Sequence, residues 1–168
     1  MGIPKTGVFG LYDLIGIDLM GDVLKSFIKE LPTDDPFHEV AQENPLVTKL
    51  ISEGYTGRKG KGGFYRMKRE RRLFRSGDKK VLEALNLKRG KYAPIKKINL
   101  GISHEINLVK LISRDDIYGK YAKSIITKVI RYAGYLIPGI TEKYIDIDDA
   151  LRLGFNWTLG PFEMLSEI

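Results

Sequence analysis

The stretch GFNWTLGPFEMLSEI, residues 154–168, contains the corner that decides the fold. A glycine and a proline stand directly before an aromatic residue and an apolar run, which is typical of a tight turn that leads into a helix. A weaker copy, KTGVFGLYDLI, occupies residues 5–15. The second copy follows the first by 153 positions, and the matched pairs are Gly7 and Gly160, Phe9 and Phe162, Leu11 and Met164, and Ile15 and Ile168. We therefore expect two related helical modules.

Apolar residues at three-four spacing predict three further helices. One covers residues 19–28, with Asp18 placed to cap its free N–H groups. A second covers residues 45–53, with Asn44 as the cap and a proline at its first position. The longest covers residues 117–133. The chain is therefore predicted to be mostly helical.

Shorter elements complete the prediction. Asp146 can cap a short helix that Gly154 would close. The string FYRM, residues 64–67, can start a strand, and residues 84–95 have the pattern of two short strands joined at Arg89 and Gly90. The expected β structure is thus a small hairpin excursion from a helical chain.

Positive charge is concentrated in one part of the chain. Residues 58–97 hold 16 Lys and Arg against three acids, a net charge of +13, whereas the remainder has 12 basic and 18 acidic residues, a net charge of −6. Such a segment favours polyanionic partners, which include nucleic acid, an acidic surface and the phosphates of coenzyme A. A solvated basic loop that binds nothing is the structural alternative.

The residues present exclude several kinds of site. The chain has no cysteine, which rules out disulfides and thiolate metal sites. No apolar run reaches the roughly 18 residues that a membrane span needs, so we expect a cytoplasmic protein without membrane contact. The two histidines, His38 and His104, and the scattered carboxylates match neither a metal-ligand set nor a nucleophile motif. We therefore predict no metal site.

Three strings carry a resemblance to a known family. IPKTGVFGLYDLIGID, residues 3–18, and GYTGRKGKGGFY, residues 54–65, resemble the C-terminal domain of 3-hydroxyacyl-CoA dehydrogenases. DIDDALRLGFNWTLGPFEMLSEI, residues 146–168, resembles the start of a second copy of that domain, as in the larger bacterial fatty acid β-oxidation proteins. The resemblance implies a mainly α fold of this type. Residues 1–98 would form a first helical unit with the basic loop and short strands, and residues 99–168 an incomplete second unit.

The family oxidises 3-hydroxyacyl-CoA to 3-oxoacyl-CoA with NAD, and its dinucleotide-binding fold and catalytic His–Glu pair lie in a preceding domain. This sequence has no G-x-G-x-x-G, and its glycine cluster at residues 57–63 precedes an aromatic pair instead of a helix. The resemblance therefore implies NAD for the complete enzyme, but no NAD site and no catalytic residue in this chain. Val8 stands where the second copy has Pro161, and no DIDDA-like helix precedes the first copy, so we expect truncation at both ends.

We expect this chain to contribute a binding surface to the complete enzyme. Arg58, Lys59 and Lys61 stand among glycines that allow close approach of an anion, and we consider these cations for a CoA phosphate. A structural role for the glycines, in turning the chain toward a strand, is the alternative. In the family this domain packs on the dinucleotide domain and on a second copy. The resemblance therefore implies the substrate-side and dimerisation region of the dehydrogenase, inactive alone, homo-oligomeric, with an acyl-CoA substrate.

A different class of function stays open. The basic segment could form a nucleic-acid-binding module, because aromatic residues that could stack on bases are interleaved with its cations, namely Phe64, Tyr65, Phe74 and Tyr92. Acyl-CoA binding with little affinity for oligonucleotides favours the dehydrogenase interpretation, whereas tight and salt-dependent nucleic-acid binding favours the module. Between the two, we expect acyl-CoA to be the partner and nucleic acid not to be.

Overall fold

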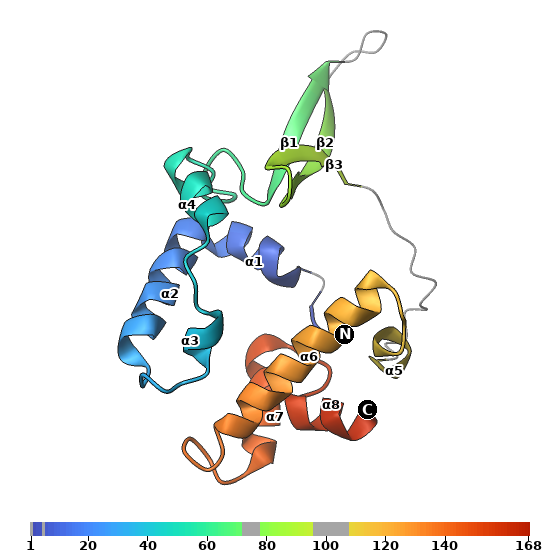
Figure 1. The fold of residues 1–168 in the computed structure, drawn as a ribbon. Helices are drawn as coiled ribbons and strands as arrows, with labels where there is room; N and C mark the ends of the chain where they lie inside the picture. Colours follow the sequence, from blue (N-terminus) through green and yellow to red (C-terminus); the bar gives the residue numbers. More distant parts are fainter. Residues whose placement is uncertain (1, 5, 72–77, 96–107) are drawn as a thin grey trace. The chain divides into compact units, whose positions relative to one another are not determined.

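The computed structural model describes residues 2–4, 6–71, 78–95 and 108–168 (Figure 1). These residues form eight helices and three strands, which are α1 (Gly7–Ile15), α2 (Ile17–Glu30), α3 (Phe37–Val40), α4 (Pro45–Ser52), β1 (Tyr65–Arg71), β2 (Asp78–Asn86), β3 (Lys91–Pro94), α5 (Leu108–Ile112), α6 (Ile117–Tyr135), α7 (Tyr144–Phe155) and α8 (Pro161–Glu167). The predicted fold class, mainly helical with a small β element, is confirmed.

The chain divides into two compact units. The first unit is Thr6–Lys97, and the second joins Met1–Lys5 to Ile98–Ile168. The N-terminal segment is linked to the second unit by a hydrogen bond in which the N–H of Thr158 donates to the carbonyl of Gly2 at 2.9 Å. That the second unit is an incomplete copy of the first stays a prediction.

The core of the first unit lies where its helices meet the base of the sheet. Ile17 at the start of α2 is fully buried, and it packs with Leu50 of α4, Phe64 just before β1 and Leu85 of β2. Gly16 has a φ of 123°, a conformation that favours glycine, and this allows α1 to turn directly into α2. The core thus links elements from both ends of the unit.

Of the two predicted caps in this unit, one is confirmed and one is wrong. Asn44 caps α4, because its Oδ1 accepts the N–H of Leu46 at 3.0 Å and Pro45 is the first helical residue. Asp18 does not cap α2, which begins one residue earlier at Ile17 with Gly16 in the cap position. Because α2 starts directly after Gly16, Asp18 lies inside its first turn and cannot take the cap position.

The β structure is larger than the predicted hairpin. The strands form one antiparallel sheet in the order β1, β2, β3. The β2–β3 turn is in the predicted place, where Oδ1 of Asn86 accepts the N–H groups of Lys88 and Arg89 and Gly90 has a φ of 61°. FYRM does start a strand, but β1 continues to Arg71 and pairs with a β2 that already begins at Asp78. Charged residues are frequent in these two strands, so the apolar alternation that usually predicts a strand is weak there.

The second unit packs α5, α6 and α8 around Leu108, Ile126 and Met164. Trp157 is part of the packing around this cluster. The longest helix is α6, as predicted, and Asp116 caps it by accepting the N–H groups of Tyr118 at 3.1 Å and Gly119 at 2.9 Å. His104 lies outside the described residues.

The predicted ends of α7 are wrong at both termini. The helix begins at Tyr144, with Lys143 in the cap position, and Asp146 inside the first turn accepts the Thr141 hydroxyl at 2.7 Å. It continues past Gly154 and ends at Asn156, which takes the left-handed conformation with a φ of 54°. Asparagine tolerates this conformation better than most residues with a side chain, so glycine is not needed there.

Candidate functional site

A buried carboxylate in α1 holds the glycine-rich loop that precedes β1. Asp13 is 4% exposed. Its Oδ1 accepts the N–H of Phe64 at 2.8 Å, and its Oδ2 accepts the N–H of Tyr65 at 2.7 Å. Its main-chain carbonyl accepts the N–H of Arg58 at 2.8 Å. One residue therefore ties α1 to both ends of the loop at residues 57–64.

The loop glycines make this contact possible. A Cβ on Gly57 would lie 2.5 Å from the Asp13 carbonyl oxygen, and a Cβ on Gly63 would overlap the Asp13 carboxylate. The N–H groups of Gly57, Gly60 and Gly63 donate to main-chain carbonyls within the loop and at the start of β1. A dinucleotide pyrophosphate needs free N–H groups at a helix N-terminus. This loop leads into β1 and not into a helix, and three of its glycine N–H groups already have acceptors, so it does not fit NAD.

The three cations considered for a CoA phosphate differ in their contacts. The Nζ of Lys59 lies 2.8 Å from Oδ2 of Asp18, and this hydrogen bond lowers the pKa of that carboxyl. The Nζ of Lys61 donates to the carbonyl of Glu53 at 3.1 Å. The Arg58 side chain is exposed and forms no ion pair within the described part of the chain. Lys59 is therefore paired with a carboxylate, whereas Arg58 and Lys61 have no ion pair in the described part of the chain, and Arg58 alone of these two forms no described side-chain hydrogen bond.

Two stacked side chains of the sheet, Arg66 and Tyr92, lie next to the glycine-rich loop. The Tyr92 hydroxyl donates to the carbonyl of Gly63 at 2.5 Å. The guanidinium carbon of Arg66 lies 3.9 Å from the Tyr92 ring centroid, and its Nε donates to Glu83 at 2.8 Å. Burial raises the pKa of Tyr92 to about 12, so the hydroxyl keeps its proton and continues to donate.

A second buried carboxylate has the same role in the other unit. Asp148 of α7 is 1% exposed. Its Oδ1 accepts the N–H of Phe162 at 2.8 Å, and its Oδ2 accepts the N–H of Glu163 at 3.2 Å. A Cβ on Gly160 would overlap the Asp148 carboxylate. Each unit therefore has an aspartate that binds two successive N–H groups and packs against a glycine without a side chain.

The two helices that the repeat predicts are both present, but the corners before them differ. Gly160 is extended, with φ −74° and ψ 170°, and its N–H donates to the Glu163 carboxylate at 2.8 Å. Before α1, Thr6 is helical and Gly7 has a φ of 62°. The position that matches Glu163 is Gly10, which has no acceptor to offer. A helix thus follows each corner, but the two corners differ in conformation, and the equivalence of the two units stays a prediction.

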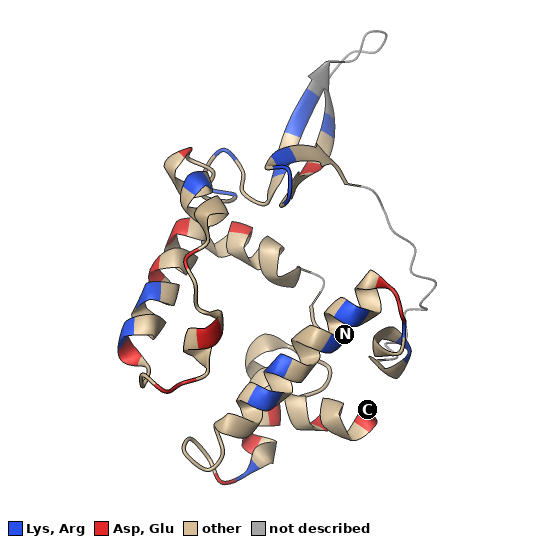
Figure 2. Ribbon diagram, in the orientation of Figure 1, with Lys and Arg blue, Asp and Glu red and all other residues tan. Residues whose placement is uncertain are grey.

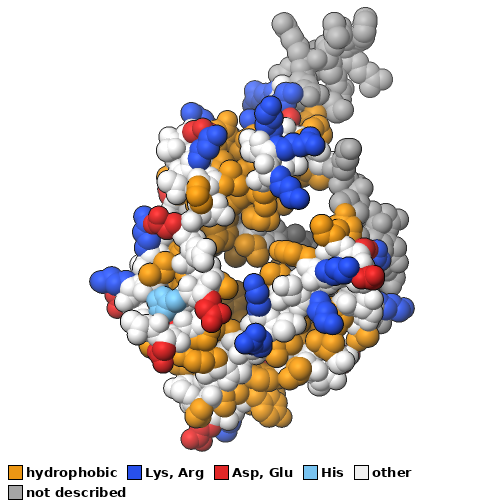
Figure 3. Space-filling model, in the orientation of Figure 1, with side chains coloured by type: hydrophobic (Ala, Val, Ile, Leu, Met, Phe, Trp, Pro, Cys, Tyr) orange, Lys and Arg blue, Asp and Glu red, His pale blue; other side chains and the backbone are white. Residues whose placement is uncertain are grey.

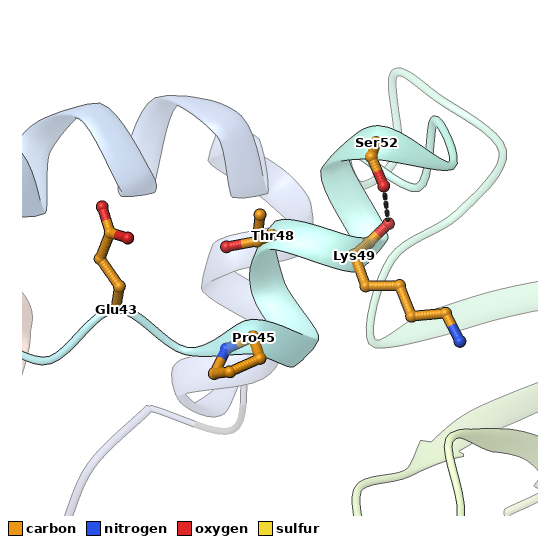
Figure 4. Close-up of a pocket in the computed structure, with 5 residues that line it drawn as sticks. All are labelled: Glu43, Pro45, Thr48, Lys49 and Ser52. Atoms are coloured by element: carbon orange, nitrogen blue, oxygen red, sulfur yellow. Dashed lines mark hydrogen bonds between the residues drawn. The ribbon is translucent and has the colours of Figure 1, made fainter.

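A shallow depression lies beside α4 in the described part of the chain (Figure 4). It has a volume of about 480 Å³, is open to solvent and is lined by Glu43, Pro45, Thr48, Lys49 and Ser52. The Ser52 hydroxyl donates to the main-chain carbonyl of Lys49 at 2.9 Å. Ordinary surface side chains line it, so it has no catalytic arrangement.

Two further kinds of site are not found in the described ranges. They contain no group of three or more His, Asp or Glu side chains placed to hold a metal ion. No helix within them is both long and apolar enough to span a bilayer.

Residues 1–67, which include α1, Asp13 and the glycine-rich loop, match the family model described as the 3-hydroxyacyl-CoA dehydrogenase C-terminal domain. The matched segment ends within β1, so β2, β3 and the second unit lie beyond it.

Curated relatives extend the similarity along the whole chain. The chain is 39% identical over 166 residues to a Rickettsia felis protein named "Putative fatty acid oxidation complex trifunctional enzyme", covering 99% of this chain and 22% of the relative. It is 26% identical over 168 residues to a Bacillus subtilis protein named "Probable 3-hydroxyacyl-CoA dehydrogenase", covering 100% of this chain and 21% of the relative. The chain thus spans about a fifth of the length of these relatives. No solved structure matches it.

Sequence reasoning did not identify Asp13 or Asp148 as residues that organise the site. The available signal was an acid inside an apolar stretch, as in LYDLIGI at residues 11–17. A carboxylate at such a position must find hydrogen-bond donors when the stretch is buried. The donors lie elsewhere along the chain. The sequence therefore predicts that the carboxylate needs hydrogen-bond donors, but it does not show which residues supply them.

Proposed function

We propose that this chain is the substrate-side and dimerisation region of an NAD-dependent 3-hydroxyacyl-CoA dehydrogenase of fatty acid β-oxidation. The complete enzyme oxidises 3-hydroxyacyl-CoA to 3-oxoacyl-CoA. The dinucleotide domain that binds NAD and supplies the catalytic His–Glu pair would come from outside residues 1–168, so the isolated chain would be inactive. The match of residues 1–67 to the C-terminal domain family is the observation that carries this proposal.

The bonding of the glycine-rich loop supports the assignment of NAD binding to another domain. The N–H groups of Gly57, Gly60 and Gly63 donate to carbonyls of the chain, and Asp13 occupies the space beside Gly63. A loop with these bonds stabilises the domain and leaves cofactor binding to another domain. In this proposal the loop contributes to acyl-CoA binding through Arg58, while Lys59 and Lys61 hold it in place.

Exposed apolar residues support a role in assembly. Val8, Leu11 and Ile15 lie on one stripe of α1, and they are 64%, 40% and 40% exposed. Apolar side chains exposed at the molecular surface, orange in Figure 3, occur on both units. Contiguous apolar surface of this kind marks interaction sites. We assign the α1 stripe to contact with a dinucleotide domain or with a second copy of the chain.

Reconstitution tests the proposal. The chain is mixed with the Bacillus subtilis relative from which the region matched here has been deleted, and NADH formation from NAD and 3-hydroxybutanoyl-CoA is followed. We expect no activity from either component and measurable activity from the mixture, with the intact relative as the positive control. A folded chain that neither restores activity nor binds acyl-CoA contradicts the proposal. So does tight, salt-dependent binding of an oligonucleotide in calorimetry.

The phosphate role of Arg58 has its own test in the active mixture. Arg58→Gln should raise the KM for the CoA substrate about fivefold, the effect of roughly 1 kcal/mol, while kcat stays unchanged. The matched control is Arg89→Gln, an exposed cation in the β2–β3 turn. With the corresponding pantetheine thioester, which lacks the nucleotide phosphates, Arg58→Gln should have no effect. An equal effect on both substrates would rule out a phosphate contact.

A further inference from the structure

One face of the sheet carries neighbouring apolar side chains that are exposed. Side chains alternate between the two faces of a sheet. Met67 pairs with Leu82, and the N–H of Ile95 donates to the carbonyl of Leu82 at 3.2 Å, so these three residues stand side by side on one face. They are 56%, 45% and 43% exposed. With Arg69, Lys80 and Ala93 of the same face they form what we call the open sheet face.

The other face of the sheet is packed. Leu85 of β2 joins the core of the first unit, and Glu83 is 4% exposed. Glu83 lies 2.8 Å from the Nε of Arg66 and 4.0 Å from the Nζ of Lys68. Cations on the packed face therefore have a carboxylate beside them.

Arg69 and Lys80 of the open sheet face have no such partner among the described side chains. Arg69 and Lys80 are directly opposite each other in the register, and Figure 2 shows Lys and Arg along both long strands. Like charges in this arrangement destabilise a sheet. Both side chains are exposed, and neither forms an ion pair with any residue that the structure describes. An anion bound between them would remove the repulsion and gain two charge-assisted hydrogen bonds.

We propose that the open sheet face binds an acidic protein segment. Apolar side chains of the segment would cover Met67, Leu82 and Ile95, and its carboxylates would bind Arg69 and Lys80. This matches the usual composition of a protein interface, an apolar centre with a polar rim.

The exposed centre of the open sheet face is aliphatic, and the one described aromatic residue of this face, Tyr65, is partly buried and packs against the core of the first unit, which leaves its ring poorly placed for stacking bases. The exposed centre also lacks the Trp and Phe anchors of membrane-surface helices. The proposal does not depend on the proposed enzymatic function.

A designed peptide provides the test. The probe is a fluorescein-labelled synthetic peptide in which Glu alternates with Leu, and its binding to the full chain is followed by fluorescence anisotropy. We expect a Kd on the order of 10 µM, which is typical of small transient contacts, and weaker binding at higher salt. Leu82→Ser and Arg69→Glu should each raise the Kd about tenfold or more.

Matched controls lie in the same hairpin. Leu87 and Arg89 are exposed residues of the β2–β3 turn, so Leu87→Ser and Arg89→Glu should change the Kd less than about twofold. Circular dichroism confirms that each variant is folded. The proposal is overturned if the peptide does not bind, if a Lys–Leu peptide binds equally well, or if the turn variants lose as much affinity. Tighter binding of single-stranded DNA or of vesicles containing phosphatidylglycerol also overturns it.

Discussion

Asp13 loses its water when α1 packs, and two main-chain N–H groups replace that water. Removing the carboxylate leaves both donors buried without an acceptor, and each unsatisfied group costs on the order of 1–3 kcal/mol. Asp13→Ala should therefore lower the free energy of unfolding by about 3 kcal/mol, measured by urea denaturation. Asp13→Asn keeps one acceptor oxygen and should lose less.

The matched control for that variant is Asp22→Ala. The Asp22 side chain is 75% exposed and its ion pair with Lys25 spans 3.9 Å, so the change should stay within about 0.5 kcal/mol. Equal stability of the Asp13→Ala and Asp22→Ala proteins would show that the buried contact is not important for the fold.

Asp116 links the stability of the second unit to pH. Hydrogen bonds from Arg114 and from the N–H of Gly119 lower the pKa of Asp116 from 3.8 to about 2. A carboxyl group with a lower pKa in the folded state stabilises that state above its unfolded pKa, and this contribution is lost as the pH falls from about 4 toward 2. The difference in unfolding midpoint between the native chain and Asp116→Asn should be constant near neutral pH and shrink in acid. A difference that does not change with pH contradicts this assignment.

At the scale of elements, the loop and α1 fit together because Gly63 has no side chain. Gly63→Ala places a Cβ in the Asp13 carboxylate and should destabilise the protein by about 2–3 kcal/mol in thermal or urea unfolding. Gly134→Ala is the matched control, since a Cβ there meets nothing within 4 Å and the residue lies inside α6. That substitution should stabilise the protein by roughly 0.5–1 kcal/mol. Equal effects at the two positions would show that the overlap is relieved elsewhere.

Three-four spacing was sufficient to predict α2, α4 and α6, because a helix that packs on one side repeats its apolar residues locally. Their ends were harder to predict. Asp18 and Asp146 are good cap residues, yet Gly16 and Lys143 take the cap positions. The run DIDD at residues 146–149 offers three acids, and only the packing of α8 selects Asp148 for burial. Local pattern predicts that a helix exists, whereas tertiary contact decides which polar residue it buries.

Over the whole molecule, uncovered apolar surface predicts self-association. Val8→Ser combined with Leu11→Ser removes two residues of the α1 stripe and should weaken association about tenfold or more in sedimentation velocity. Ile140→Ser is the control, because Ile140 is 76% exposed but lies outside this stripe. A native chain that stays monomeric at all micromolar concentrations would contradict contact of the α1 stripe with a second copy of the chain.

The contacts around the glycine-rich loop could be predicted only in part from the sequence, because the residues that make them lie far apart along the chain. The loop itself can be identified from its glycines, and the N–H groups of Gly57, Gly60 and Gly63 are bonded within the chain. Asp13 was missed because its partners, Phe64 and Tyr65, are 51 and 52 residues away. The roles of Lys59 and Lys61 depend on Asp18 and Glu53, whose approach requires α2 and α4 to be in place. The phosphate role of Arg58 stays a prediction.

Asp13 and Asp148 close chain segments of very different length. The first reaches Phe64 across 51 residues, and the second reaches Phe162 across 14. The entropy cost of bringing the ends of a chain segment together grows with the logarithm of its length. Closing the longer segment therefore costs roughly 1 kcal/mol more. The contact of Asp148 needs only two neighbouring helices, whereas the contact of Asp13 requires the helices between its ends to pack first. When the denatured chain refolds, the contact of Asp148 is thus expected to form ahead of the contact of Asp13.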